Sequence, residues 1–141
     1  MARKGLRIGL IGVGAAAQVN HIPAWKRIEG VELVALCDRD PEKAARVAQK
    51  FQVSRVHARV DDLLADDEVD AVDICTPNYL HAPIGTAALE SSKHVLCERP
   101  LARSAQEAEG MLKAARKADR QLMCCVQHRF RPDAQLLKKF V

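Results

Sequence analysis

The chain is 141 residues long, with 48% hydrophobic and 28% charged residues and a formal net charge of +4. This composition is that of a soluble globular protein, and the length suits one domain with a hydrophobic core. No apolar run is long enough to span a membrane, and the basic residues are not interleaved with aromatics. We therefore expect no membrane insertion and no nucleic-acid binding.

The first predicted element is a strand over Leu6–Gly12, followed by a glycine turn and three alanines that favour a helix. In such a turn Gly12 permits the tight bend, and Gly14, which has no Cβ, lets the backbone approach a pyrophosphate. The phosphates would then lie at the helix N-terminus, on Ala15 and Ala16, where free N–H groups and the helix dipole attract anions.

A second apolar run, Val31–Cys37, predicts a parallel strand that ends in Asp38. A carboxylate at that strand end can accept hydrogen bonds from the adenosine ribose hydroxyls and would repel a 2′-phosphate, which favours NAD. The neighbouring Arg39 can hold a phosphate, so NADP remains an alternative. Asp38 or Asp40 could instead only cap the next predicted helix, Pro41–Phe51, and Asp40 fits that role better.

The rest of the chain continues to alternate strand and helix patterns. Further strands are expected at Arg55–Ala58, Ala71–Cys75, His94–Cys97 and Leu122–Val126. Helices are expected at Asp61–Ala65, Asn78–Ser91, Ser104–Ala118 and Pro132–Val141. A capping box, Ser104 with Glu107, opens the third of these helices, whose inner face should carry Ala108, Met111, Leu112 and Ala115. The alternation predicts an α/β fold, a Rossmann doubly wound parallel sheet with strand order 3-2-1-4-5-6 and helices on both faces.

This strand order brings the ends of the first and fourth strands side by side, at the point where such sheets bind ligands. Pro77 stops the fourth strand, so Thr76 and Asn78 would project beside the ribose and nicotinamide of a cofactor, with His81 one helical turn further on. Asn78 could instead only cap the following helix.

The fifth strand ends in a second polar pair stopped by a proline, Glu98-Arg99-Pro100. Glu98 and Arg99 could reach the nicotinamide end of the same crevice, or they could form a solvated ion pair without a role.

The five cysteines are Cys37, Cys75, Cys97, Cys124 and Cys125. They show neither a Cys-x-x-Cys pair nor a zinc-like spacing with histidine, so we expect no metal site. All five are interpreted as reduced thiols of a cytoplasmic protein.

Over nearly its whole length the sequence resembles the N-terminal half of the Gfo/Idh/MocA oxidoreductases, which include glucose–fructose oxidoreductase and inositol dehydrogenase. The segments that carry the resemblance are Gly12–Gly14, His21, Cys37–Pro41, Asp73–Asn78, His81 and Lys93–Pro100. The resemblance implies that the glycines bind pyrophosphate, that Thr76-Pro77-Asn78 lines the nicotinamide ribose, and that the residue at position 99 lies near nicotinamide and substrate.

The chain departs from the family pattern in two ways. The family usually has Glu-Lys-Pro at positions 98–100, whereas this chain has Arg99, which stays charged and could clamp a substrate oxygen but not act as a base. Proton transfer would then fall to another group such as His128, which could equally be a linker residue without a role.

The second departure is length, because family members continue into a larger substrate domain. We expect residues 1–126 to form the dinucleotide-binding domain. Residues 127–141 would form a linker and helix leading to a substrate domain absent from this truncated chain. An unpartnered apolar patch at Leu136, Leu137, Phe140 and Val141 would favour a homo-oligomer.

These observations favour one function over two alternatives. The chain is interpreted as the NAD(P)-binding domain of an oxidoreductase that moves hydride between nicotinamide and a sugar, polyol or related alcohol, with little activity by itself. A non-catalytic NAD(P)-binding module, for redox sensing or partner docking, is the alternative that Arg99 favours. A methyltransferase could share the sheet and the glycine turn, but the polar elements at residues 76–78 and 98–100 argue against it.

Overall fold

A computed structural model describes residues 5–140 and contains a six-stranded parallel sheet with the order β3-β2-β1-β4-β5-β6. The strands are β1 (Leu6–Ile11), β2 (Val31–Cys37), β3 (Arg55–His57), β4 (Ala71–Ile74), β5 (His94–Cys97) and β6 (Leu122–Cys124). All six strands were predicted, as was their order. Four of them (β1, β3, β4 and β6) end one or two residues before the predicted limit, where the chain turns toward the carboxyl edge of the sheet.

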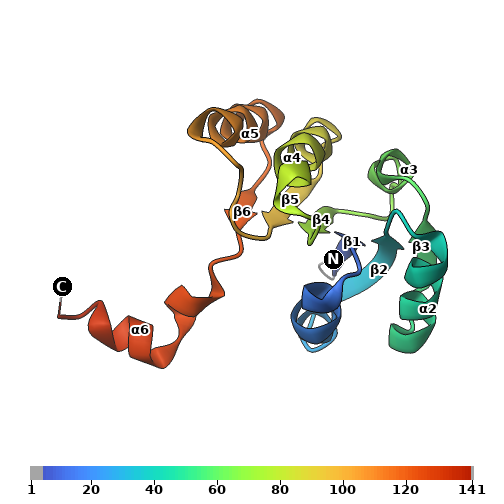
Figure 1. Ribbon diagram of the computed structural model, residues 1–141, viewed down its shortest axis with the longest axis horizontal. Coiled ribbons are helices and arrows are strands. Elements are labelled where there is room, and N and C mark those ends of the chain that lie inside the picture. Colours follow the sequence, from blue (N-terminus) through green and yellow to red (C-terminus); the bar gives the residue numbers. More distant parts are fainter. Residues whose placement is uncertain (1–4, 141) are drawn as a thin grey trace.

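Helices cover both faces of the sheet, as the doubly wound pattern predicts (Figure 1). One face carries α3 (Val60–Leu64), α4 (His81–Glu90) and α5 (Ala105–Ala118). The other face carries α2 (Pro41–Phe51) and the helix after β1, which comprises η1 (Ala17–His21) and α1 (Ile22–Trp25). None of the helices within residues 5–140 combines the length and the hydropathy that crossing a membrane requires.

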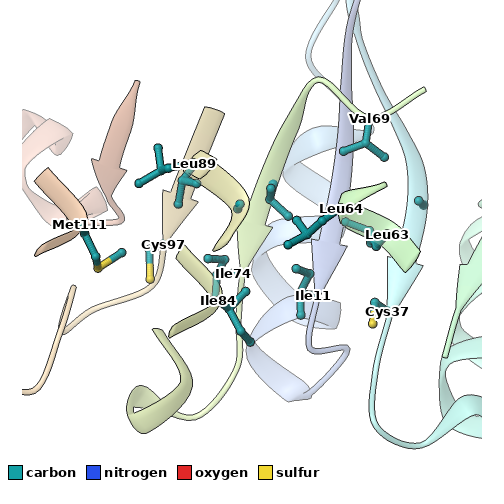
Figure 2. Close-up of a cluster of buried hydrophobic side chains, with 14 of the residues drawn as sticks. Ile11, Cys37, Leu63, Leu64, Val69, Ile74, Ile84, Leu89, Cys97 and Met111 are labelled. Atoms are coloured by element: carbon teal, nitrogen blue, oxygen red, sulfur yellow. The ribbon is translucent and has the colours of Figure 1, made fainter. Parts of the chain in front are cut away.

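Each face of the sheet has its own hydrophobic core, because successive side chains of a strand point to opposite faces. In β1, Ile11 belongs to the core under α3, α4 and α5, whereas Ile8 and Leu10 belong to the core under α1 and α2. Figure 2 shows the first of these cores, in which Leu63, Leu89 and Met111 from the covering helices meet the buried strand residues. Because the two cores hold β1 from both sides, the glycine turn at its end has a rigid base.

Helix termini account for the corrections to the predicted helices. The expected helix Asn78–Ser91 begins as a 3-10 turn, η2 (Asn78–Leu80), before α4. Ser104 caps α5 by accepting from Glu107 N at 3.1 Å, but the Glu107 carboxylate accepts from Arg103 N and not from Ser104, so the capping box is only half formed. The prediction that Leu112 lies on the inner face of α5 is wrong, because Leu112 is 43% exposed.

The helix after β1 widens into a π-helical segment, Ala17–His21, which the sequence analysis did not predict. Ile22 N donates to Ala17 O, five residues back instead of four. Pro23 follows directly, and it has no N–H for an α-helical bond while its ring would crowd the carbonyl four residues earlier. The wide turn accommodates the proline, and the segment ends at a buried histidine, His21.

The last segment leaves the sheet (Figure 1). It consists of η3 (Gln127–Phe130) and α6 (Pro132–Leu137), which is shorter than the predicted helix; Val141 lies outside the described residues. Its apolar side chains are exposed, at 70% for Phe130, 66% for Leu137 and 81% for Phe140. The five cysteines are free thiols, as predicted.

Candidate cofactor site

The glycine turn lies at the carboxyl end of β1, against the end of β4. Gly12 has φ of 93°, and a Cβ there would lie 2.8 Å from the carbonyl of Cys75. Gly12 N also donates to Cys37 O at 2.8 Å, which ties the turn to the end of β2. A Cβ on Gly14, by contrast, would meet nothing within 4 Å. The first glycine is therefore required by the fold itself, whereas the second leaves open space in front of the helix.

Asp38 holds this turn in place. Its carboxylate accepts from Val13 N at 2.9 Å and from Asp40 N at 3.1 Å, and Lys43 Nζ lies 3.4 Å away. Burial alone would raise the pKa of Asp38, but these two N–H groups and the Lys43 ammonium bring it below its ordinary value. Asp40 caps α2 by accepting a hydrogen bond from Lys43 N at 3.0 Å, which confirms the sequence-based preference for Asp40 over Asp38 as the cap.

A cavity of about 470 Å³ opens between this turn and the end of β4. Eight of the residues predicted to bind a cofactor line it: Gly12, Gly14, Ala15, Ala16, Asp38, Arg39, Thr76 and Pro77. Cavities of this size hold small molecules. Thr76 Oγ1 is buried and has no hydrogen-bond partner among the described residues, and such an orphaned hydroxyl is unusual unless a ligand completes it.

A second polar cluster lies beside this cavity, around His21. His21 Nδ1 is 2.8 Å from Asp73 Oδ2, and His21 Nε2 is 3.0 Å from Glu98 Oε1. Trp25 Nε1 also donates to Asp73 Oδ2, at 2.6 Å. His21 thus joins the helix after the glycine turn to the ends of β4 and β5, and Asp73, which is fully buried, has its charge balanced.

The hydrogen bond to Asp73 raises the pKa of His21 to about 9 against the effect of burial, and Glu98 raises it further. Burial would raise the pKa of Glu98, but the hydrogen bonds from His21 and from Arg99 N bring it below its ordinary value. His21 is therefore an imidazolium between two carboxylates at neutral pH.

His81 joins the ends of β4 and β5 a second time. It is buried, and its Nδ1 lies 2.7 Å from Pro100 O while its Nε2 lies 2.8 Å from Thr76 O. The structure therefore places His81 behind the turn that carries Thr76, where it fixes that turn and does not face the cavity.

The structure does not bring the remaining predicted residues into the cavity. Asn78 is exposed in η2. The carboxylate of Glu98 accepts a hydrogen bond from His21 and does not line the cavity. Arg99 is exposed, and among residues 5–140 its guanidinium has no hydrogen-bond partner. His128 is exposed in η3, on the segment that leaves the sheet.

The role of Asp73 was not predicted from the sequence. It sits at the third position of a short buried strand, where the other three residues are apolar. An isolated aspartate in such a run requires a buried partner, and this signal could have identified the cluster. It could not have identified His21 as that partner, because 52 residues separate the two.

Residues 6–126 match the oxidoreductase family with an NAD-binding Rossmann fold, GFO_IDH_MocA. The chain belongs to this family. The resemblance seen in the sequence is thereby confirmed for the dinucleotide-binding domain, and the parallel sheet with its glycine turn is the binding fold of the family.

Curated relatives and solved structures agree with this assignment. The chain is 39% identical over 134 residues to 4-carboxy-2-hydroxymuconate-6-semialdehyde dehydrogenase of Sphingobium, covering 94% of the chain and 42% of that protein. It is 33% identical to D-glucoside 3-dehydrogenase of Escherichia coli, covering all of the chain and 40% of that protein.

Among solved structures, the WlbA dehydrogenase of Chromobacterium violaceum, in complex with NADH and UDP-GlcNAcA, has a TM-score of 0.92 at 33% identity. The match covers 99% of this chain and 40% of that one. KijD10, a 3-ketoreductase of Actinomadura kijaniata in complex with NADP and TDP-benzene, has a TM-score of 0.91 at 30% identity, covering 96% and 43%. The chain thus spans about two-fifths of the length of these relatives.

Proposed function

We propose that this chain is the NAD(P)-binding domain of an oxidoreductase that transfers hydride between nicotinamide and a sugar, polyol or related alcohol. The observation that carries the proposal is the cradle at the end of β1. Gly12 has no room for a side chain, Gly14 leaves space open, and the hydroxyl of Thr76 has no partner within residues 5–140. Together they fit a diphosphate and ribose better than they fit a closed core.

The chain's own residues would bind and orient the dinucleotide. Ala15 and Ala16 line the cavity and begin the helix, where N–H groups have no intrahelical partner and could bind a pyrophosphate. Thr76 and Pro77 would border the nicotinamide ribose. The nicotinamide supplies the hydride donor or acceptor, and the protein supplies position and charge.

For the adenosine end, NAD is the proposed cofactor and NADP the alternative. Asp38 lines the cavity, and a carboxylate at this position favours ribose hydroxyls over a 2′-phosphate. Arg39 and Lys43 line the same end and could hold a phosphate. The solved relatives described above include a complex with each kind of cofactor.

For the chemical step, Arg99 would hold a substrate oxygen or carboxylate, because a guanidinium keeps its charge. His128 would then move the proton, provided that residues 127–141 connect to a substrate domain that brings the two together. The replacement of the family's lysine by Arg99 also supports the second candidate, a non-catalytic NAD(P)-binding module. Dehydrogenase assays of the longest native gene product on a panel of polyols and sugars distinguish the two.

The proposal is tested by calorimetry with NADH, NADPH and S-adenosylmethionine on the wild type and on two glycine variants. Gly14→Ala should weaken the binding of NADH at least tenfold, which is about 1.4 kcal/mol. The melting temperature should stay nearly unchanged, since the added Cβ meets no protein atom within 4 Å. Gly12→Ala should destabilise the fold by about 2 kcal/mol, because of its positive φ and the contact with Cys75. Binding of S-adenosylmethionine without NADH, or an unaffected Gly14→Ala variant, would contradict the proposal.

A further inference from the structure

Three side chains that can bind a metal converge beside His21, and each comes from a different element. They are His21 at the end of the π-helical segment, Glu98 after β5 and Cys125 after β6. One ligand atom from each, Nε2, a carboxylate oxygen and Sγ, lies within 4.8 Å of the other two. The positions are too distant in sequence to form a spacing motif, which is why the sequence predicted no metal site.

The imidazole of His21 is already oriented as a metal ligand. Its Nδ1 is held at 2.8 Å by Asp73, which is itself fixed by Trp25 Nε1. A histidine that binds a metal through one nitrogen usually donates its other N–H to a carboxylate, which sets the tautomer and the ring orientation. Asp73 therefore stands where an outer-shell partner belongs, and Nε2 faces Glu98 and Cys125.

A second group, His21 with Asp73 and Cys75, is less suited to a metal. Asp73 is fully buried, and Cys75 Sγ donates to it at 3.7 Å. His21 and Cys125, in contrast, both line a mostly apolar cavity of about 240 Å³, together with residues that include Trp25 and Leu96. An ion could enter from this cavity, and water could take the remaining coordination position.

We propose that His21 Nε2, Glu98 and Cys125 form a binding site for a zinc ion, with the fourth position open. The donor set of one imidazole, one carboxylate and one thiolate suits zinc, which accepts nitrogen, oxygen and sulfur in tetrahedral sites. The ion would replace the proton that His21 Nε2 shares with Glu98 and the thiol proton of Cys125, and both protons leave to solvent. It would link the helix after the glycine turn to the ends of β5 and β6.

The test is direct metal binding to the purified 141-residue chain without nucleotide. Zn²⁺ is titrated by competition with a chelating dye, and Co²⁺ is added to report thiolate ligation through its near-ultraviolet charge-transfer band. We expect one Zn²⁺ per chain, a Co²⁺–thiolate band, and a melting temperature that rises with Zn²⁺ and returns on chelation.

The neighbouring cysteine gives a matched control. Cys125→Ser should abolish the Co²⁺ band and weaken the binding of Zn²⁺ at least 100-fold, whereas Cys124→Ser should leave the band and the affinity unchanged. Asp73→Asn should weaken Zn²⁺ by about 10- to 100-fold while the band persists, as expected for an outer-shell partner. Absence of Zn²⁺ binding, or binding that Cys125→Ser does not weaken, would overturn the proposal. Neither result depends on nucleotide binding, so the site can fail while the proposed cofactor function stands.

Discussion

The ion pairs of His21 should make the stability of the domain depend on pH in a defined direction. The pKa of His21 rises from 6.5 to about 9 on folding, with Asp73 as the largest cause. Its contribution is therefore fully present below pH 6.5 and is lost as the pH rises through 9. At about 1.4 kcal/mol per unit of pKa, this shift adds about 3 kcal/mol to the free energy of unfolding at pH 6 and almost nothing at pH 10.

Urea unfolding of the wild type and of His21→Gln at intervals from pH 6 to pH 10 measures this contribution. The wild type should lose its advantage over the variant by about 2 to 3 kcal/mol between pH 7 and pH 10. Of the other titratable groups near His21, the Cys125 thiol has a pKa raised to about 11 by burial, and the pKa of Glu98 lies below its ordinary value. Neither therefore titrates in this range in the folded state.

His128→Gln is the control, because His128 is exposed in η3. Its difference from the wild type should stay constant across the same range. A difference between wild type and His21→Gln that is equally constant would refute the reasoning, since it would mean that His21 carries no extra proton in the folded state.

Three further predictions concern other parts of the chain. Asp38→Ala should weaken the binding of NADH more than the binding of NADPH. Both affinities should also fall by a smaller, shared amount, because Val13 N loses its acceptor. Calorimetry that shows equal losses for the two cofactors would remove Asp38 from the ribose site. Ser104→Ala should lower the free energy of unfolding by about 1 kcal/mol through loss of the cap on Glu107 N, and an unchanged urea midpoint would contradict this. Leu137→Glu should reduce self-association through the exposed apolar side chains of α6, and light scattering that finds the wild type monomeric at all concentrations would exclude that contact.

The six strands and their order could be predicted, although four strand ends were not, because the signal of a strand is local and repeated. Each strand is a short apolar run followed by turn residues, and the alternation with amphipathic segments such as Pro41–Phe51 leaves few topologies open. Errors arose where a local pattern met a tertiary constraint. Leu112 has the spacing of a core residue but is exposed in the folded chain, and the π-helical turn depends on how a helix adapts to Pro23.

The cavity could be predicted to the extent that strand ends meet at one edge. Gly12, Asp38 and Thr76 each follow a strand, and the order of the strands alone brings them together. The bonds between side chains could not be predicted. That Asp38 holds the glycine turn, and that His81 joins two strand ends from behind, depends on distances that no spacing in the sequence encodes.

The two histidines explain how a short chain fixes the carboxyl ends of β4 and β5. The strand pairing of β4 with β5 ends at Ile74 and Cys97, and one further main-chain bond, from Glu98 N to Ile74 O at 2.9 Å, reaches into the turn after β5. The two ring nitrogens of His81 lie within hydrogen-bond distance of a carbonyl in each turn, and His21 donates to the carboxylates that flank them. Because an imidazole ring carries two nitrogens that point in different directions, one histidine can contact two elements at a defined separation. These two side chains therefore add to the main-chain bonds of the sheet in holding this edge rigid, as a cofactor site requires.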